Sequence, residues 1–433
     1  MARIDRWAVA LAVPLVLAAC TTASGRSGGG LSPASPLTTV SLPPSGPGRE
    51  SAVAVQARLC RRPPVPSPTP ATPAPVPSAL ARVEHEVEVA RELAYLHPVA
   101  VDAVTHAELV RGIDQSFNHS FPRAMTAARG RAWQAVGVIP RGTDLRQAYH
   151  RFLSSQIIGY YDPTTGQLVF IGTNNPSPTE RLTLAHELTH ADDDQHFDLS
   201  RINGLENHCQ DEQEMAATGA VEGSAVFFSL NVAERFFSPG DISSILSQQV
   251  PPPTGVPIFL QRLLIWPYVD GPKFIAALKA RGGLAEVNRA LQDWPVSTEQ
   301  VMHPSRYPSD VPARVEVPPL TSALRRAPDL DVMDVGEEWL KDMLSLRLAP
   351  GVAARVAAGW GGGQYRAWSV KGGVLVAMVT AWDTPADASQ FAAALTRWLR
   401  PGQHALVALA GKDRVLALFA TSGAALRAAR SRR

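Results

Sequence analysis

The sequence predicts an α+β fold, in which a mainly helical domain with a small β-hairpin precedes a small α+β module. From Ser78 the pattern turns helical, with Leu80, Val83, Val87, Ala90 and Leu93 at three- and four-residue intervals, and further helical segments follow in the region from 79 to 325. Within it, residues 156–172 hold two apolar runs around the turn sequence Asp162-Pro163-Thr164-Thr165-Gly166, which indicates a hairpin. Beyond residue 326, helical and strand-like segments alternate at short intervals, and we find no internal repeat.

Composition excludes several classes of protein. The chain has 433 residues, of which 45% are hydrophobic and 18% charged, so it is neither wholly disordered nor a small disulfide scaffold. It has 41 Lys and Arg against 39 Asp and Glu, and no basic stripe interleaved with aromatic residues. We therefore expect no nucleic-acid partner.

The first residues indicate export. Arg3 and Arg6 precede an apolar run from Trp7 to Ala19 that is too short to span a bilayer. It ends Leu17-Ala18-Ala19-Cys20, which resembles the bacterial lipobox. We expect residues 1–19 to be a lipoprotein signal peptide and Cys20 to carry the lipid, which places the protein on the extracytoplasmic face of the cell membrane. The alternative is an ordinary signal peptide and a secreted protein.

The next segment, residues 20–78, is predicted to be a disordered tether. Thirteen of the 37 prolines fall between Pro33 and Pro77, a density that excludes a helix or a central strand. Because Cys60 lies in this segment, we expect Cys60 and Cys209 to be free thiols, although an oxidising compartment would allow them to pair.

The domain expected over 79–325 begins with Ser78 as a helix N-cap, and Thr105-His106-Ala107-Glu108 is a capping box. The helix that carries the chemistry is expected to begin at Thr179 as N-cap. In order, helices are predicted near residues 78–93, 106–117, 122–136, 144–154, 179–195, 212–233, 273–280 and 284–291.

A weaker boundary near 319–328 precedes the module expected over 326–433. Its Trp360 and Trp382 are expected in the core of the module. Helices are predicted near 335–346 and 384–399, and strands near 364–370, 374–380, 404–410 and 415–420.

One helix concentrates the candidate chemistry. His186-Glu187-Leu188-Thr189-His190 is an HExxH motif, and residues four apart on a helix differ by only about 40° in azimuth. Both imidazoles therefore leave the same face one turn apart and can share a zinc ion. Glu187 lies beside that face, where it can take a proton from the attacking water and pass it to the leaving amine. The uncharged neighbours of the motif predict a largely buried helix.

A catalytic zinc usually takes three protein ligands. The downstream candidates for the third are His196, His208, Cys209, Asp211, Glu212, Glu214 and Glu222. We favour Glu222, because it is the one carboxylate of a small-residue, apolar helical segment, residues 216–228, where an unpaired charge would be costly. The alternative is a buried ion pair between Glu222 and an arginine.

These segments resemble a known family. The HExxH motif, Asp194-Gln195-His196-Phe197-Asp198-Leu199 and Val221-Glu222-Gly223 are similar to those of a largely uncharacterised bacterial and archaeal family of extracytoplasmic zinc metalloproteases. Segments 159–163, 297–304, 359–362 and 381–383 add to the likeness, although Asp192, Asp193 and Gly363 depart from it. The resemblance implies a zincin-like domain with a gluzincin site, as in thermolysin-like enzymes. Since the interval from His190 to Glu222 is longer than in those enzymes, residues 200–210 are expected to form an inserted loop.

Three residues are assigned secondary roles. Asp194 lies four residues after His190 and could orient it, or could instead cap a loop. His303 or Tyr307, in the family-like segment and just after it, could stabilise an oxyanion, or could have a structural role in a turn. The hairpin precedes the zinc helix as an edge strand does in zincins, so an extended peptide could pair with it.

We therefore expect a membrane-tethered, extracytoplasmic zinc peptidase that acts on proteins or peptides. The alternative is a catalytically silent binding lipoprotein in which zinc is structural or absent. The sequence leaves the substrate and the oligomeric state open.

Overall fold

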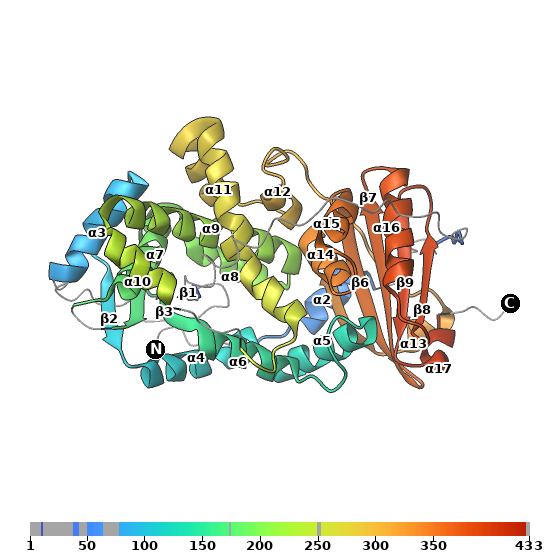
Figure 1. The fold of residues 1–433 in the computed structure, drawn as a ribbon. Coiled ribbons are helices and arrows are strands. Elements are labelled where there is room, and N and C mark those ends of the chain that lie inside the picture. Colours follow the sequence, from blue (N-terminus) through green and yellow to red (C-terminus); the bar gives the residue numbers. More distant parts are fainter. Residues whose placement is uncertain are drawn as a thin grey trace.

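The computed structural model describes residues 10–11, 38–42, 50–63, 78–172, 175–248 and 253–429. The α+β prediction is confirmed. A helical domain carries a four-stranded sheet, and a C-terminal module is built on a five-stranded sheet. The two lie side by side, with the helical domain at the left of Figure 1 and the module at the right. Cys20 and most of the expected tether lie outside the described residues.

The helical domain contains most of the predicted helices. In chain order its elements are α3 (Ser78–Arg91), β2 (Ala100–Val104), α4 (His106–Ser120), α5 (Arg123–Val136), α6 (Leu145–Gln156), β3 (Ile157–Asp162), β4 (Gln167–Ile171), α7 (Pro178–Phe197), the 3₁₀ turn η1 (Leu199–Arg201), α8 (Ile202–Asn207), α9 (Asp211–Phe236), α10 (Pro239–Ser247), α11 (Ile258–Gln292) and α12 (Thr298–Met302).

Helix starts follow the capping chemistry of the sequence. The Thr105 side chain accepts from the Glu108 backbone N–H, and the Glu108 carboxylate accepts from the Thr105 backbone N–H, so the predicted capping box is confirmed. Thr179 is not the N-cap of α7. Ser177 takes that position in a second capping box, with Glu180 as its partner, and Pro178 occupies the first turn, where its missing N–H costs no hydrogen bond.

The small sheet has the strand order β1-β3-β4-β2. The predicted hairpin is confirmed, with β3 and β4 antiparallel and Gly159 opposite Phe170. Two strands were not expected: β2 runs parallel to β4, and β1 (Ala10–Leu11) pairs antiparallel with β3. The hairpin therefore accepts a further strand on each of its edges.

Helix α11 runs from Ile258 to Gln292, but the backbone leaves helical geometry at Gly282 and Gly283, where Gly283 has φ 68°, and this kink divides it into two helices. The predicted break and the helix near 284–291 are therefore confirmed, whereas the first helix is longer than predicted, because it begins at Ile258 and not near 273. Its first half contains Pro267 and Pro272, which masked its helical character in the sequence.

Glycines set the distance between α9 and α11. A Cβ on Gly223 would overlap the backbone of Gly271, and a Cβ on Gly271 would overlap the backbone at Gly219 and Gly223. The two helices therefore meet backbone to backbone.

The C-terminal module has the strand order β5-β6-β7-β9-β8, all antiparallel. Trp360 and Trp382 are buried in its core, as predicted. Strand β5 and helix α15 were not expected, and Val315, Val317 and Leu324 already pack on this sheet, ahead of the boundary expected at 326. The elements are α13 (Ser322–Arg326), β5 (Asp329–Asp334), α14 (Glu337–Ser345), α15 (Pro350–Ala357), β6 (Trp360–Val370), β7 (Gly373–Trp382), α16 (Pro385–Trp398), β8 (His404–Leu409), β9 (Arg414–Ala420) and α17 (Gly423–Arg427).

Part of the expected tether is folded. Residues 48–62 contain no proline, and within them Ala52–Leu59 forms α2, capped by Ser51 and packed against β5. Cys60, at the end of α2, forms a disulfide with Cys209. The predictions of a disordered tether over this stretch and of two free thiols are therefore wrong. The regional proline density concealed a proline-free amphipathic segment whose apolar face meets the module.

Residues 200–210 are likewise not an extended loop, because η1 and α8 occupy much of this stretch and Leu199 and Ile202 are buried against α9.

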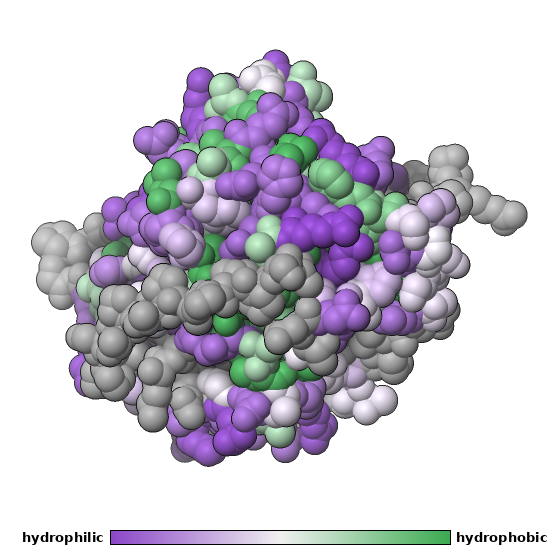
Figure 2. All heavy atoms as spheres, turned by 90° about the vertical axis from the view of Figure 1, so that its left-hand side faces the viewer, coloured by the Kyte–Doolittle hydropathy of each residue, from purple (hydrophilic) through white to green (hydrophobic). Residues whose placement is uncertain are grey.

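On the face of the helical domain in Figure 2, hydrophobic residues form small separate groups among hydrophilic ones. Among the helices of the described ranges, none is long and apolar enough to cross a membrane.

Candidate metal centre

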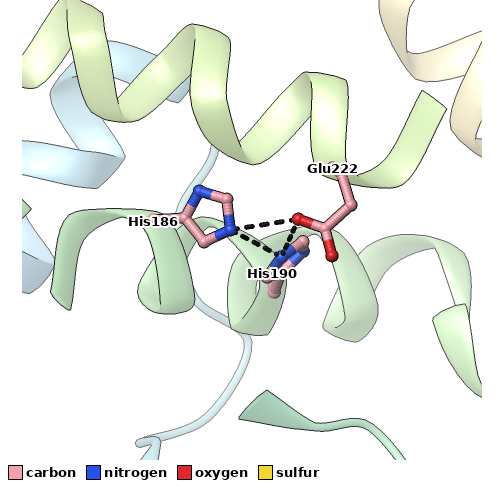
Figure 3. A group of neighbouring side chains, drawn as sticks. All are labelled: His186, His190 and Glu222. Carbon is pink, nitrogen blue, oxygen red and sulfur yellow. Dashed lines mark hydrogen bonds and ion pairs between the residues drawn. The ribbon is translucent and has the colours of Figure 1, made fainter. Parts of the chain in front are cut away.

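The two histidines of the HExxH motif lie on adjacent turns of α7 and face the same way (Figure 3). Each is only 1% exposed. Their Nε2 atoms are 3.2 Å apart. The helical spacing predicted from the sequence therefore brings the two imidazoles to a single point.

Glu222 approaches that point from α9, on the opposite side in Figure 3. Its Oε2 lies 3.1 Å from Nε2 of His186 and 3.3 Å from Nε2 of His190. The side chain is completely buried. Although burial raises it, the charges of His190 and His186 hold the pKa of Glu222 below its ordinary value.

These three side chains fit one metal ion. Among the residues that the structure describes, they are the group whose ligand atoms converge in this way. Zinc bonds of about 2.0–2.1 Å in a tetrahedral site place neighbouring ligand atoms about 3.3 Å apart. The observed separations of 3.1, 3.2 and 3.3 Å match the edges of one face of that tetrahedron. A buried His186-His190-Glu222 group can therefore bind a metal.

Glu187 differs from the three ligands in its surroundings. It is fully buried, and neither oxygen makes a well-formed hydrogen bond with another described residue. Burial raises the pKa of Glu187 to about 8, and the negative charge of Glu222 adds to the rise.

Tyr268 of α11 completes the centre, and the sequence analysis missed it. Its ring stacks near His186, with centroids 6.1 Å apart and planes inclined by 22°. Its hydroxyl donates to the Glu222 carboxylate, and burial holds its pKa well above the ordinary value, so it stays a donor. The residue lies between Pro267 and Pro272, and no local pattern connects this segment with the motif.

Asp194 does not orient His190. Its Oδ2 accepts from the Tyr161 hydroxyl at 2.8 Å and its Oδ1 from the Leu199 backbone N–H at 2.8 Å. Nδ1 of His190 has no partner within the described ranges. Asp194 therefore has the alternative role, closing the end of α7, because the start of η1 turns the chain back over its carboxylate.

The two departures from the family pattern at Asp192 and Asp193 also act structurally. Asp193 accepts from Arg91 Nε at 2.7 Å and from Ser224 Oγ at 2.6 Å, and thus joins α3, α7 and α9. Asp192 faces His196 at 3.5 Å. Burial raises the pKa of Asp192 to about 7.

His303 and Tyr307 are engaged elsewhere. Nε2 of His303 lies 3.0 Å from the Glu337 carboxylate, between α12 and α14. The Tyr307 hydroxyl donates to the Asp293 carbonyl at 2.6 Å, and its ring packs edge-on against Phe274. The structure does not bring either residue to the histidine pair, and their structural role is the one that it shows.

The other third-ligand candidates have partners of their own. Cys209 is disulfide-bonded, Asp211 pairs with Arg129, and Glu212 accepts from Thr298. His196 and His208 contact the carbonyl oxygens of Ala94 and Gly204.

Comparison with known proteins adds a family for the module and little for the metal centre. Residues 326–430 match a family described as a domain of unknown function (DUF8575). The chain matches no curated protein. Among solved structures, it resembles a protein from Chloroflexus aurantiacus described as a proposed hydrolase with a novel fold, at 15% identity and a TM-score of 0.35, over 59% of this chain and 94% of that one.

Proposed function

We propose that this protein is a zinc-dependent peptidase, with His186, His190 and Glu222 as metal ligands and Glu187 as the proton-transferring group. The observation that carries the proposal is the tetrahedral spacing of the three ligand atoms beside a buried carboxylate with no well-formed hydrogen bond. The sequence likeness to extracytoplasmic zinc metalloproteases supports the same assignment.

The chain divides the chemistry among few residues. Zinc, when bound, would supply the Lewis acid that polarises the scissile carbonyl and makes water a nucleophile at neutral pH. Glu187, which is fully buried one residue after the ligand His186, takes the proton of the attacking water and delivers it to the leaving amine. Tyr268 holds the Glu222 carboxylate in place through its hydroxyl.

The edge of β3 offers a path for an extended substrate. β3 packs against α7, and the segment Ala10–Leu11 pairs with it in antiparallel register, Ala10 opposite Gly159. This segment belongs to the expected signal peptide, so its removal before Cys20 would free the edge. A peptide bound in this manner would gain main-chain hydrogen bonds that do not depend on its side chains.

We place the protein outside the cytoplasm, anchored through a lipid on Cys20. The Cys60–Cys209 disulfide supports an oxidising compartment. Replacing Cys20 by Ala should abolish the incorporation of radiolabelled palmitate in a lipidating host. If the unmodified protein takes up no label, the anchor is wrong and the secreted form is preferred.

The rival function is a binding lipoprotein with a structural zinc or none. A structural zinc site usually closes with four protein ligands, whereas three converge here. Such a site also has no use for Glu187, whose burial without a well-formed hydrogen bond costs stability.

The test measures metal and cleavage together. We expect the mature protein, purified from a lipidating host, to contain about one zinc per chain and to cleave an unstructured protein until a chelator is added. Glu187→Gln should keep the zinc and lose turnover by several powers of ten. Zinc binding without cleavage by the unmodified protein would favour the binding lipoprotein, and unchanged cleavage by Glu187→Gln would remove the mechanism.

A further inference from the structure

A pocket lies between the helical domain and the C-terminal module, and it shares a wall with the metal centre. Its lining comes from α5, α6, α9 and α11 on one side and from β5 and α14 on the other. Tyr268, which contacts His186 and Glu222, also lines this pocket. On α9, Glu214 and Thr218 line it on the helical stripe that continues to Glu222, four residues further on.

The pocket is mainly apolar. Its walls include Trp133, Phe152, Met215, Leu264, Met333 and Trp339. Its cavity volume is about 120 Å³, close to that of apolar cavities of about 150 Å³ that accept a single benzene ring. Aromatic walls of this kind favour an aromatic guest, because rings pair edge to face.

Its charged groups are largely neutralised by one another. Arg129 pairs with Asp211 and Asp331, and Glu338 pairs with Lys341. Burial raises the pKa of Glu212 to about 8, so this carboxyl is mostly uncharged at neutral pH. Glu214 and Asp334 line the pocket as well, and burial raises the pKa of Asp334 above its ordinary value.

Two donors in the wall lack a partner. The indole N–H groups of Trp133 and Trp339 are buried and have no acceptor among the residues that the structure describes. The two rings lie 6.4 Å apart at 66°. A buried N–H without an acceptor is costly, and the carbonyl groups of a bound peptide are acceptors of the right kind.

We propose that this pocket binds a large apolar, preferably aromatic, side chain next to the scissile bond, so that the module of unknown function selects the substrate. This inference rests on the proposed peptidase activity and deepens it. Met333 and Trp339 come from the module, so the module forms part of the substrate site.

The test uses pairs of internally quenched peptides that differ only in the residue beside the central bond, Phe or Ala. We expect kcat/KM to be at least about tenfold higher for the Phe peptide. Leu264→Trp fills the pocket and should bring the two values within about twofold of each other, with zinc content unchanged. The matched control is Leu246→Trp on α10, which is 56% exposed and should keep the tenfold ratio.

Two further variants guard against a folding defect. Leu264→Ala enlarges the pocket and should raise kcat/KM for a Trp peptide relative to the Phe peptide. Trp339→Phe replaces the indole by a smaller ring without an N–H, and should lower kcat/KM about fivefold for the Phe and the Ala peptide alike, because both carry the same main-chain carbonyl groups. Equal cleavage of the Phe and Ala peptides, or a preference that survives Leu264→Trp, would overturn the pocket assignment while the peptidase stands.

A failure of the proposed peptidase activity can be told apart from a failure of the pocket assignment by measuring binding. If the zinc-loaded protein cleaves neither peptide, the proposed activity is wrong, and calorimetry with the same two peptides tests whether the pocket binds the aromatic side chain. Tenfold tighter binding of the Phe peptide, lost in Leu264→Trp, would retain the pocket, and equal affinities would remove it.

Discussion

The backbones of Gly223 and Gly271 are in direct contact, and this contact sets the position of the neighbouring Glu222 carboxylate. Helix α9 carries Glu222, and α11 carries Tyr268, whose hydroxyl holds that carboxylate. Any side chain at either glycine would push the helices apart. The metal centre therefore depends on a crossing that contributes no ligand itself.

Replacing Gly271 by Ala should loosen the metal centre. The added Cβ overlaps the α9 backbone, which cannot give way as a flexible side chain could, so we expect a loss of about 1–3 kcal/mol in the free energy of unfolding. Zinc affinity should fall as well. Gly204→Ala on α8 is the control, because nothing lies within 4 Å of its added Cβ. Denaturant unfolding measures the stability of the two variants, and zinc titration measures their zinc affinity. Unchanged zinc affinity in Gly271→Ala would show that the contact between α9 and α11 does not position the metal centre.

Replacing Glu222 by Ala should lower zinc affinity at least about a hundredfold, because it removes one of three converging ligand atoms. The matched control is Glu234→Ala on the same helix, whose side chain is exposed. Competition with a zinc chelator measures both affinities. If the Glu222 variant binds zinc like the unmodified protein and loses only thermal stability, the carboxylate is structural.

Removing the disulfide should destabilise the fold without emptying the metal centre. Cys60 and Cys209 are 149 residues apart, and closing a long loop restricts the unfolded chain, so Cys60→Ser should cost about 2–5 kcal/mol. Zinc content should remain about one per chain, since neither cysteine is among the converging ligands. Thermal unfolding with and without a reductant tests this, and reductant should have little effect on the Ser variant.

Glu212 should make stability depend on pH. Burial raises the pKa of Glu212 from 4.5 to about 8, so between these values the folded chain binds a proton that the unfolded chain has lost. The contribution of this group to stability therefore falls as pH rises from about 4.5 to 8. Glu212→Gln keeps an oxygen that can accept both hydrogen bonds from Thr298 and has no charge to bury.

The free energy of unfolding of the Gln variant should thus equal that of the unmodified protein near pH 4.5. Above pH 8 it should be larger by about 1–3 kcal/mol. Unfolding curves of the two proteins at several pH values give this difference. The contributions of all other titrating groups cancel in it, because both proteins contain them. A difference that does not change with pH would show that Glu212 stays ionised.

Features that depend on near neighbours in the chain were predictable. The one-face arrangement of His186 and His190 follows from helical periodicity, and the start of α4 follows from the Thr105 capping box. Glu222 could be chosen because the apolar composition around it predicts burial, and a buried carboxylate needs a strong partner; the side chain is indeed buried. The hairpin followed from its turn sequence.

Features that join distant segments were not predictable. Tyr268 reaches the centre only because α11 crosses α9 at glycines, and Cys60 finds Cys209 only because α2 folds against the module. Asp194 lies at the right helical spacing to serve His190, yet the hydroxyl of Tyr161 on β3 takes its carboxylate. Periodicity and capping act within a few residues, whereas these contacts depend on packing between elements, which no short window of sequence encodes.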